Sequence, residues 1–326
     1  MKLWTIIAGI CSVLFLFNSC NEDFQLTENW KDIPVVYGFI NRLDTAHYVR
    51  VEKVFVDENK SAKTIAQIVD SLYYPNAVVK IINRTTKREV ILKRVDGNLE
   101  GFQRRAGDFA TAPNYLYKYY PHELVMNGGD SLQFELNRGD GKKPVTANIK
   151  ILSNIKMTNP SQMDKSLSFN PKASTTYSWS IPEARVYSID MDITVTEFNN
   201  STNTKTEKKI HIPINDQLFS STVTFRGLSF FENLKSNLTV DNQIRREIFS
   251  VDLTVKAAGP ELYSFLEIVN ANTGVTASQE IPRYTNMSEG FGIFSSTTST
   301  VSRFGITPET ISELKNNELT RDLNFY

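Results

Sequence analysis

Two acidic residues in the second half of the chain have the spacing of a catalytic pair. Asp190 and Asp192 alternate with apolar residues, so a β-strand would project both carboxylates from one face, roughly 7 Å apart. A pair of carboxylates at such a separation is compatible with glycoside hydrolysis. Alternating acids on the wet face of a strand are also ordinary solvation, and we favour that interpretation. No catalytic residue is assigned.

The three histidines do not indicate metal chemistry. None of His47, His122 and His211 has a second histidine or a cysteine at metal-ligand spacing. His211 lies between Ile210 and Ile212, which predicts a place on the wet face of a strand. Gly-x-Ser-x-Gly elbows, Walker loops and dinucleotide fingerprints are absent from the sequence. We therefore expect a protein without enzymatic activity, metal or cofactor.

An aromatic cluster precedes Pro121. Tyr115, Tyr117 and Tyr119 would line one face of a strand. Tyrosine is enriched at interfaces, which makes this cluster a candidate interface. The alternative is an inward face filled with rings, and we favour that core position while keeping the interface as a second hypothesis.

One thiol predicts a covalent modification. Cys20 follows an apolar stretch over residues 3–17, with Lys2 before the stretch and Ser19 in the small-residue position. The pattern resembles a lipoprotein signal peptide (residues 1–19), whose removal leaves Cys20 to be acylated. The apolar run is shorter than the about 20 residues that span a bilayer. An uncleaved anchor helix is the alternative to a membrane anchor made of lipid.

The residues after Cys20 refine the predicted location. Glu22 and Asp23 place paired acids beside the lipid. They resemble the acidic export signal of surface lipoproteins in Bacteroidota, and a merely polar tether over residues 20–33 is the alternative. We expect an outer-membrane, lipid-anchored protein on the cell surface.

The amino-acid composition excludes further classes of protein. The 326 residues include 36 basic and 36 acidic side chains, so no large basic surface for nucleic acid is expected. The two cysteines are Cys11, which leaves with the signal, and Cys20. No disulfide is therefore expected, and stability must come from a hydrophobic core, which a chain of this size can build.

Short stretches of alternating apolar residues predict β-strands from Pro34 onward. The expected strands cover residues 35–40, 47–56, 77–82, 89–95, 132–136, 145–151, 187–196, 210–214 and 249–255. Long helices between successive strands, which a parallel sheet needs, are absent from this pattern. Antiparallel sheets are therefore predicted.

Helical spacing interrupts the strands in four places. Residues 61–74 carry apolar side chains at helical spacing, and 231–238 and 260–269 are two further candidates. A last helix is expected to begin with Thr307 as its N-cap and Pro308 in its first turn.

These elements predict a mostly all-β chain with two antiparallel β-sandwich domains of the immunoglobulin/fibronectin-III-like type and short helical insertions. The first sandwich is expected over residues 34–153 and the second over 176–326. Residues 154–175, rich in Asn, Ser, Lys and Pro, form the predicted linker.

Several stretches share a pattern that extends through nearly the whole mature chain, namely 35–40, 48–51, 129–136, 145–149, 179–182, 259–263 and 284–294. Together they resemble a Bacteroidota outer-membrane lipoprotein family classed as domain of unknown function 4249. The closing segment 284–294, with its Asn and Gly residues, is the most specific piece. The genes of the family often neighbour TonB-dependent transporters, so the resemblance implies a transporter-associated lipoprotein and carries over no catalytic residues.

Three short motifs resemble the Asp–Ser/Thr–aliphatic O-glycosylation signal of Bacteroidota. They place candidate acceptors at Thr45, Ser71 and Ser131. The tripeptide Arg138–Gly139–Asp140 matches an integrin ligand, but within a predicted hairpin turn it is most simply turn chemistry.

The expected function is that of a non-enzymatic outer-membrane lipoprotein, accessory to a TonB-dependent transporter or binding its ligand. An adhesin or structural surface protein is the first alternative. A glycan-active enzyme that uses loop carboxylates is the second.

Overall fold

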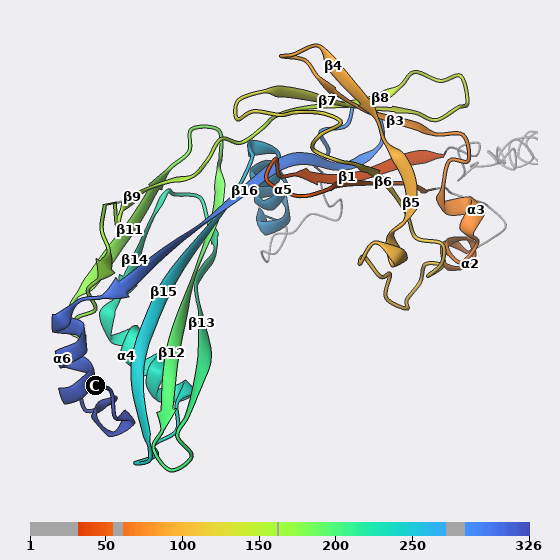
Figure 1. Cartoon of the computed structure of the whole chain (residues 1–326). Helices are drawn as coiled ribbons and strands as arrows, with labels where there is room; N and C mark the ends of the chain where they lie inside the picture. The colour runs from red at the N-terminus through yellow and green to blue at the C-terminus, as the bar shows by residue number, and fades with distance from the viewer. Residues whose placement is uncertain (1–31, 55–60, 162, 272–283) are drawn as a thin grey trace, which may run out of the picture.

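The computed structural model describes residues 32–54, 61–161, 163–271 and 284–326 (Figure 1). Strands make up 47% of the structure and helices 17%, with several antiparallel sheets. The mostly β, sandwich-like fold expected from the sequence is therefore confirmed.

One large sheet of nine strands extends through both halves of the molecule. Its strands are β1 (Ile33–Ile40), β2 (His47–Val54), β5 (Lys93–Asp96), β6 (Tyr115–Tyr119), β10 (Ser166–Leu167), β12 (Val186–Asn199), β13 (Thr204–Leu218), β15 (Ile244–Ala258) and β16 (Phe291–Ile306). They follow the order β13-β12-β15-β16-β1-β2-β6-β5, and β10 pairs with β16.

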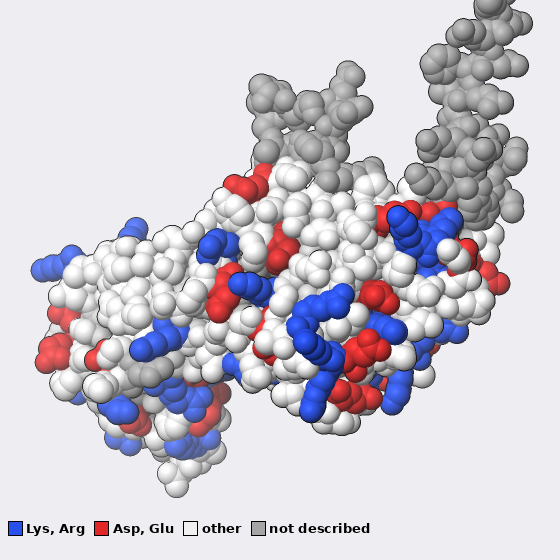
Figure 2. Space-filling view, turned by 90° about the horizontal axis from the view of Figure 1, so that it is seen from above, with Lys and Arg blue, Asp and Glu red and all other residues white. Residues whose placement is uncertain are grey.

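Two smaller sheets each cover one half of the large sheet (Figure 1). The first consists of β3 (Val78–Asn83), β4 (Arg88–Ile91), β7 (Ser131–Asn137) and β8 (Val145–Lys150). The second consists of β9 (Lys156–Asn159), β11 (Ser174–Ser180) and β14 (Thr222–Arg226). A separate hydrophobic core fills each half, because alternating strand residues point inward from both layers. Seen from above, acidic and basic side chains are interspersed over the half that carries the four-stranded sheet (Figure 2).

The helices are short and lie at the ends or sides of the sheets. They are α2 (Ala62–Ala66), α3 (Val69–Leu72), α4 (Gly227–Asn237), α5 (Pro260–Ala271) and α6 (Pro308–Asn316), with 3-10 turns η2 (Gly97–Leu99) and η3 (Arg321–Leu323). The predicted start of α6 is confirmed, since the Thr307 side chain accepts a hydrogen bond from the backbone N–H of Thr310. The single helix expected over 61–74 was wrong, because Ile68 has an extended backbone that separates α2 from α3.

The last strand belongs to both halves of the molecule. Residues 291–296 of β16 pair in parallel with β1, whereas residues 297–304 pair antiparallel with β15. The parallel contact departs from the expected antiparallel pairing. Gly292 is required there, because its φ is +119° and a Cβ at this position would lie 1.8 Å from the Val36 carbonyl oxygen. Met287 and Phe294 consequently complete the first core, although the sequence-based division assigned them to the second domain.

Two predicted strands differ in detail. Residues 89–95 form two strands, β4 and β5, which lie in different sheets on either side of the buried Leu92. Phe249 was expected inside with Val251 but is 57% exposed. A bulge explains the difference, because Thr194 pairs with Ser250 and Val195 with Ile248, which leaves Phe249 without a partner in the register.

Candidate functional site

The outer face of the first hairpin carries aromatic rings that are not covered by the core. Along β1, Val36 and Ile40 point into the first core, so Tyr37 and Phe39 point the other way and are 47% and 41% exposed. The antiparallel register places Arg50 of β2 opposite Tyr37. This face is the floor of a depression that we call the trough.

Helix α5 and the 97–114 loop, which joins β5 to β6, flank the floor on two sides (Figure 1). A cavity of about 600 Å³ lies between the hairpin and α5, with lining side chains that include Val35, Val54, Phe109, Phe265, Tyr284 and Ile293. A second cavity of about 560 Å³ continues along the hairpin, and its lining includes Phe39, Tyr48, Arg50, Glu100 and Phe102. Tyr37 lines both cavities, which therefore meet at its side chain, and the trough comprises the two together.

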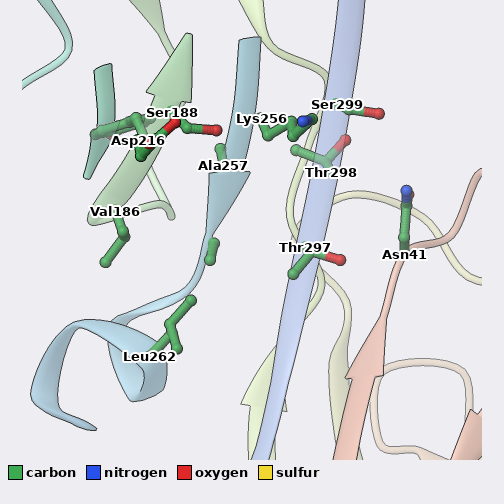
Figure 3. Close-up of a pocket in the computed structure, with 12 residues that line it drawn as sticks. Asn41, Val186, Ser188, Asp216, Lys256, Ala257, Leu262, Thr297, Thr298 and Ser299 are labelled. Carbon is green, nitrogen blue, oxygen red and sulfur yellow. The ribbon is translucent and has the colours of Figure 1, made fainter. Parts of the chain in front are cut away.

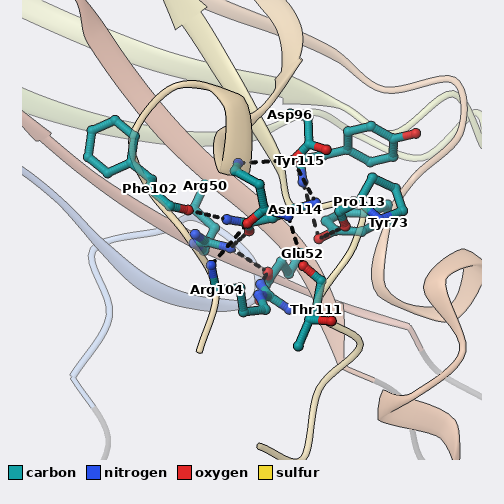
Figure 4. Close-up of polar contacts among 11 residues, drawn as sticks. Arg50, Glu52, Tyr73, Asp96, Phe102, Arg104, Thr111, Pro113, Asn114 and Tyr115 are labelled. Atoms are coloured by element: carbon teal, nitrogen blue, oxygen red, sulfur yellow. Dashed lines mark hydrogen bonds and ion pairs between the residues drawn. The ribbon is translucent and has the colours of Figure 1, made fainter. Parts of the chain in front are cut away.

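A buried polar network fixes the 97–114 loop against the hairpin (Figure 4). Asn114, which is fully buried, accepts a hydrogen bond from Arg50 Nη1 at 2.7 Å and donates one to the Phe102 carbonyl oxygen at 2.7 Å. Its backbone N–H donates to Asp96 Oδ1 at 3.1 Å. These bonds connect both ends of the loop to β2, so the aromatic residues of the loop are held at a defined position over the trough.

Further bonds hold the rest of the same loop. Asn98 donates from Nδ2 to the Thr111 carbonyl oxygen at 2.9 Å, and its Oδ1 accepts from the backbone N–H of Arg104 at 3.0 Å. The Tyr73 hydroxyl donates to the Pro113 carbonyl oxygen at 3.1 Å. The wall of the trough is thus built on side-chain bonds rather than on regular secondary structure.

The charges in the network are unequal. Glu52 forms ion pairs with both Arg50, at 2.9 Å, and Arg104. Burial lowers the pKa of both guanidinium groups, and at Arg104 the neighbouring Arg50 adds to the effect. Arginine nevertheless remains charged in proteins. Two cations therefore share one carboxylate, and Nη1 of Arg104 is buried without a hydrogen-bond partner.

The carboxylate of a second acidic residue beside the trough is bonded to neighbouring side chains. Glu100 accepts hydrogen bonds from Lys118 Nζ at 2.6 Å and from the Tyr48 hydroxyl at 2.9 Å. These two donors lower the pKa of the Glu100 carboxyl group, and Glu100 raises the pKa of Lys118. The pair is a closed unit, and it adds no net charge.

The tyrosines expected on one face have different surroundings. Tyr117 and Tyr119 are 3% and 1% exposed and belong to the first core, and burial raises the pKa of Tyr119. Tyr115 is half-buried beside Tyr73, with ring centroids 4.9 Å apart, and Arg94 lies over its ring. Tyr117 and Tyr119 therefore present no ring surface to a partner, whereas Tyr115 lies behind the trough wall.

The three histidines lie in unrelated places. His47 is 2% exposed and packs on Tyr119, and burial lowers its pKa to about 4. Neither of its ring nitrogens has a partner. His122 stacks on Tyr120 with ring centroids 5.5 Å apart. His211 lies on β13 at the surface.

The acidic pair Asp190 and Asp192 is neutralised by cations from neighbouring strands. Asp190 pairs with Lys256 at 3.0 Å, and Asp192 pairs with His211 at 2.8 Å and with Lys209 at 3.5 Å. Sequence spacing placed the two acids on one face but could not supply these partners, because they come from β13 and β15.

A third cavity of about 390 Å³ lies where β16 passes from one half to the other (Figure 3). Polar side chains such as Ser188, Asp216 and Lys256 line it, and so does Thr298, whose hydroxyl is buried without a partner. The positive group in this cavity is already paired, since Lys256 binds Asp190. The trough is larger and carries both exposed rings and unbalanced charge, so it is the better candidate for a binding site.

The remaining predicted positions are dispersed. Cys20, Glu22 and Asp23 lie outside the described residues, so their roles stay predictions. Thr45 is exposed in the turn between β1 and β2, whereas Ser71 in α3 and Ser131 in β7 are partly buried.

The Arg138–Gly139–Asp140 turn is not a free ligand loop. Arg138 is 3% exposed and contacts Asp140 at 3.6 Å and Glu289 at 3.3 Å. The arginine thus fixes the β7–β8 hairpin to the closing segment, as turn chemistry would require.

Sequence reasoning missed the trough residues. One signal was present, because residues 35–40 are apolar at nearly every position and not only at alternate ones. A strand with two apolar faces must cover both or use one for binding. The rings of the walls come from distant segments, around residues 102, 109 and 265, and only the fold brings them to the hairpin.

Two other kinds of site are absent from the described ranges. No three His, Cys, Asp or Glu side chains of the described residues are arranged to hold a metal ion. None of the described helices has the length and apolar character needed to cross a bilayer.

Fold and site together define a mostly β, sandwich-like protein with an aromatic trough on its first hairpin. The family described as domain of unknown function (DUF4249) matches residues 22–303, and the chain belongs to this family. No curated protein matches the chain. The matched region ends before α6, the helix that packs against the second core.

Proposed function

We propose that this protein is a non-enzymatic, lipid-anchored outer-membrane protein that binds a ligand in its trough and delivers it to a TonB-dependent transporter. The trough is the single observation that carries the proposal. Exposed aromatic rings beside a rigid, hydrogen-bonded wall are what a binding site needs, because the rings supply apolar area and the wall limits the loss of entropy on binding.

The titratable groups support a binding role over catalysis. His47 is buried and uncharged near neutral pH, since burial lowers its pKa to about 4, so it is poorly suited to general acid–base chemistry at pH 7. Asp190 is paired with Lys256 and Asp192 with Lys209. Among the described residues, Asn98 and Asn114 hold the loop beside the trough and Glu100 is bonded to Lys118 and Tyr48, which are structural tasks.

The anchor and the transporter rest on the sequence. Cys20 would carry the lipid, and residues 20–33 would separate it from β1. The family resemblance supplies the transporter as a partner. For the anchor, we expect the wild-type chain to incorporate radiolabelled palmitate and to partition into the membrane. Cys20→Ser should abolish both. Labelling that persists in the variant contradicts the lipid site.

The accessory role is tested in the native host. We expect a TonB-dependent transporter, identified by mass spectrometry, to co-purify with the tagged chain in mild detergent. A chain that purifies alone under these conditions contradicts the partnership. Normal attachment with impaired nutrient uptake in a deletion strain would exclude the adhesin alternative.

The trough is tested by complementation of that deletion strain. The double variant Tyr37→Ser/Phe39→Ser should reach the membrane at normal levels but fail to restore uptake. Val301→Ser is the matched control, because Val301 is 61% exposed on the second half of β16 and far from the trough. Full restoration by the double variant would remove the trough from the proposed function.

A further inference from the structure

Among the described residues, two guanidinium groups and one carboxylate meet beside the trough. Arg50 and Arg104 approach the same carboxylate of Glu52, and the side chain of Arg50 is 26% exposed and lines the second cavity. A guanidinium group has five N–H donors, and one carboxylate cannot satisfy two such groups. The pair therefore has donor capacity left for an additional acceptor.

Partial burial of the two guanidinium groups makes their unsatisfied donors energetically unfavourable in the ligand-free protein. The side chain of Arg104 is 12% exposed, and its Nη1 has no acceptor. A buried charged donor without a partner destabilises the site. An anionic ligand that accepts from Arg50 would leave more of the Glu52 carboxylate to Arg104 and relieve this.

The rest of the site is apolar on either side of the arginine residues. Tyr37 lies directly across from Arg50 in the hairpin register, and Phe39 and Phe102 line the cavity beside it. On the other side of Glu52 the larger cavity includes Phe109 and Phe265. The charged group and the apolar surface are thus contiguous.

Among the described residues, the other charges around the trough balance one another. Glu100 is occupied by Lys118 and Tyr48. Asp44 lines the second cavity from the β1–β2 turn and offsets part of the positive charge there. Lys53 lines the larger cavity and adds positive charge.

We infer that the trough takes an amphipathic anion, a small molecule with a flat apolar body and one acidic group. The acidic group binds at Arg50, which lines the second cavity and shares Glu52 with Arg104, and the body lies on Tyr37 and the neighbouring rings. This inference rests on the proposed function of the trough as a ligand site and adds the chemical class of the ligand.

Two fluorescent probes with the same aromatic body test the charge directly. 1-Anilinonaphthalene-8-sulfonate carries one sulfonate, and N-phenyl-1-naphthylamine lacks it. Titration of the folded mature chain with each should give about tenfold tighter binding of the sulfonate, the size of one charge-assisted hydrogen bond.

Substitutions then assign the preference to the arginine pair. Arg50→Gln should weaken sulfonate binding about tenfold and leave binding of the neutral probe unchanged. Glu52→Gln removes the competing carboxylate and should strengthen sulfonate binding. Arg303→Gln is the matched control, since Arg303 pairs with Asp252 on the other half of the sheet, and it should change neither affinity.

Equal affinities for both probes, or weaker sulfonate binding in Glu52→Gln, overturn the anionic class. Thermal melting of each variant shows whether it is folded, and Glu52→Gln alone decides if Arg50→Gln does not fold. Failure of both probes to bind overturns the trough as a small-molecule site, whereas co-purification with a transporter tests the accessory role independently.

Discussion

Both halves of the large sheet carry charged residues, and the two halves differ in how completely these charges are paired. On the C-terminal half, Arg303 donates hydrogen bonds to both carboxylate oxygens of Asp252 at 2.8 Å. Lys256 donates to the Asp190 carboxylate at 3.0 Å. His211 and Arg303 lie at the ends of a row in which Asp192 and Asp252 face each other across β12 and β15. Asp192 is paired with Lys209 and Asp252 with Arg303, so each acid of this row has a cation of its own.

The trough on the N-terminal half has the opposite character. There two guanidinium groups share Glu52, and aromatic rings such as Phe39 and Phe102 remain about half exposed beside them. A charged row with matched partners is a solvated sheet face that needs no further molecule. Unequal charge next to exposed rings is what distinguishes a binding surface, and the contrast directs attention to the trough rather than to the acidic pair.

The largest expected effect contrasts the histidines of the two regions. His47 lies beneath the trough without a partner for its ring, whereas His211 is exposed and bonded to Asp192. The folded pKa of His47 is about 4, below the roughly 6.5 of an unfolded chain. The unfolded state therefore binds the additional proton, and stability that is full above pH 6.5 falls as the pH drops toward 4, by up to about 3 kcal/mol.

The variant His47→Phe keeps a ring against Tyr119 and removes this titration. Urea unfolding between pH 7 and pH 4 should show a flatter profile for the variant than for the wild type, with similar stability at pH 7. An unchanged slope would mean that His47 is protonated in the folded protein, and the region beneath the trough would then be more polar than its contacts indicate.

A smaller effect is expected from the loop network. Asn114→Ala leaves the Phe102 carbonyl oxygen unpaired and removes one of the two acceptors of Arg50 Nη1, which keeps only Glu52. The change should cost about 1–3 kcal/mol. Hydrogen exchange should increase over residues 97–114 and not over β12. Asp192→Ala is the matched variant in the charged row and should cost less than about 1 kcal/mol, because its partners are exposed. Equal losses in the two variants would remove the distinction between a structural network and a solvated row.

Local patterns predicted much of the fold. Alternation located β12, whose residues Ile189, Met191 and Ile193 are fully buried, and the Thr307 cap located the start of α6. Sequence could not predict the break at Leu92 or the bulge at Phe249, because both depend on which strands lie alongside. Nor could it predict the parallel pairing of β1 with β16, which joins segments more than 250 residues apart.

The candidate site was less accessible to sequence reasoning. Tyrosines close together in the sequence drew attention to Tyr117 and Tyr119, yet strand alternation buries them in the first core. The trough depends instead on residues such as Arg50 and Arg104, which meet only because the 97–114 loop folds back on β2. Spacing along the chain identifies a face of a strand, whereas a site between a strand and a distant loop requires the register and the loop path.

The ion pair of Asp252 should contribute only slightly to stability, since the Arg303 side chain is 67% exposed. Hydrogen bonds from Arg303 hold the pKa of Asp252 below its usual value. Its contribution is present above roughly pH 3.9, the unfolded value, and is lost as the pH falls through the lower folded pKa. Asp252→Asn should therefore be slightly less stable than the wild type at pH 7, and its stability should fall less than that of the wild type on acidification. Denaturant titrations at pH 7 and pH 3 would measure both differences. If the variant is less stable than the wild type by the same amount at both pH values, packing and not charge causes the difference in stability.

The smallest expected effect concerns the rings of the trough. Phe39→Ser should change the free energy of unfolding by no more than about 0.5 kcal/mol, as should Val301→Ser on the other half of the sheet, because both side chains are largely exposed. The two variants should differ in probe binding, which Phe39→Ser weakens and Val301→Ser leaves unchanged. A loss of 2 kcal/mol or more in Phe39→Ser would show that the ring packs as part of the core. The aromatic residues of the trough would then need no ligand to explain their presence, and the contrast between the two faces would reduce to a difference in packing.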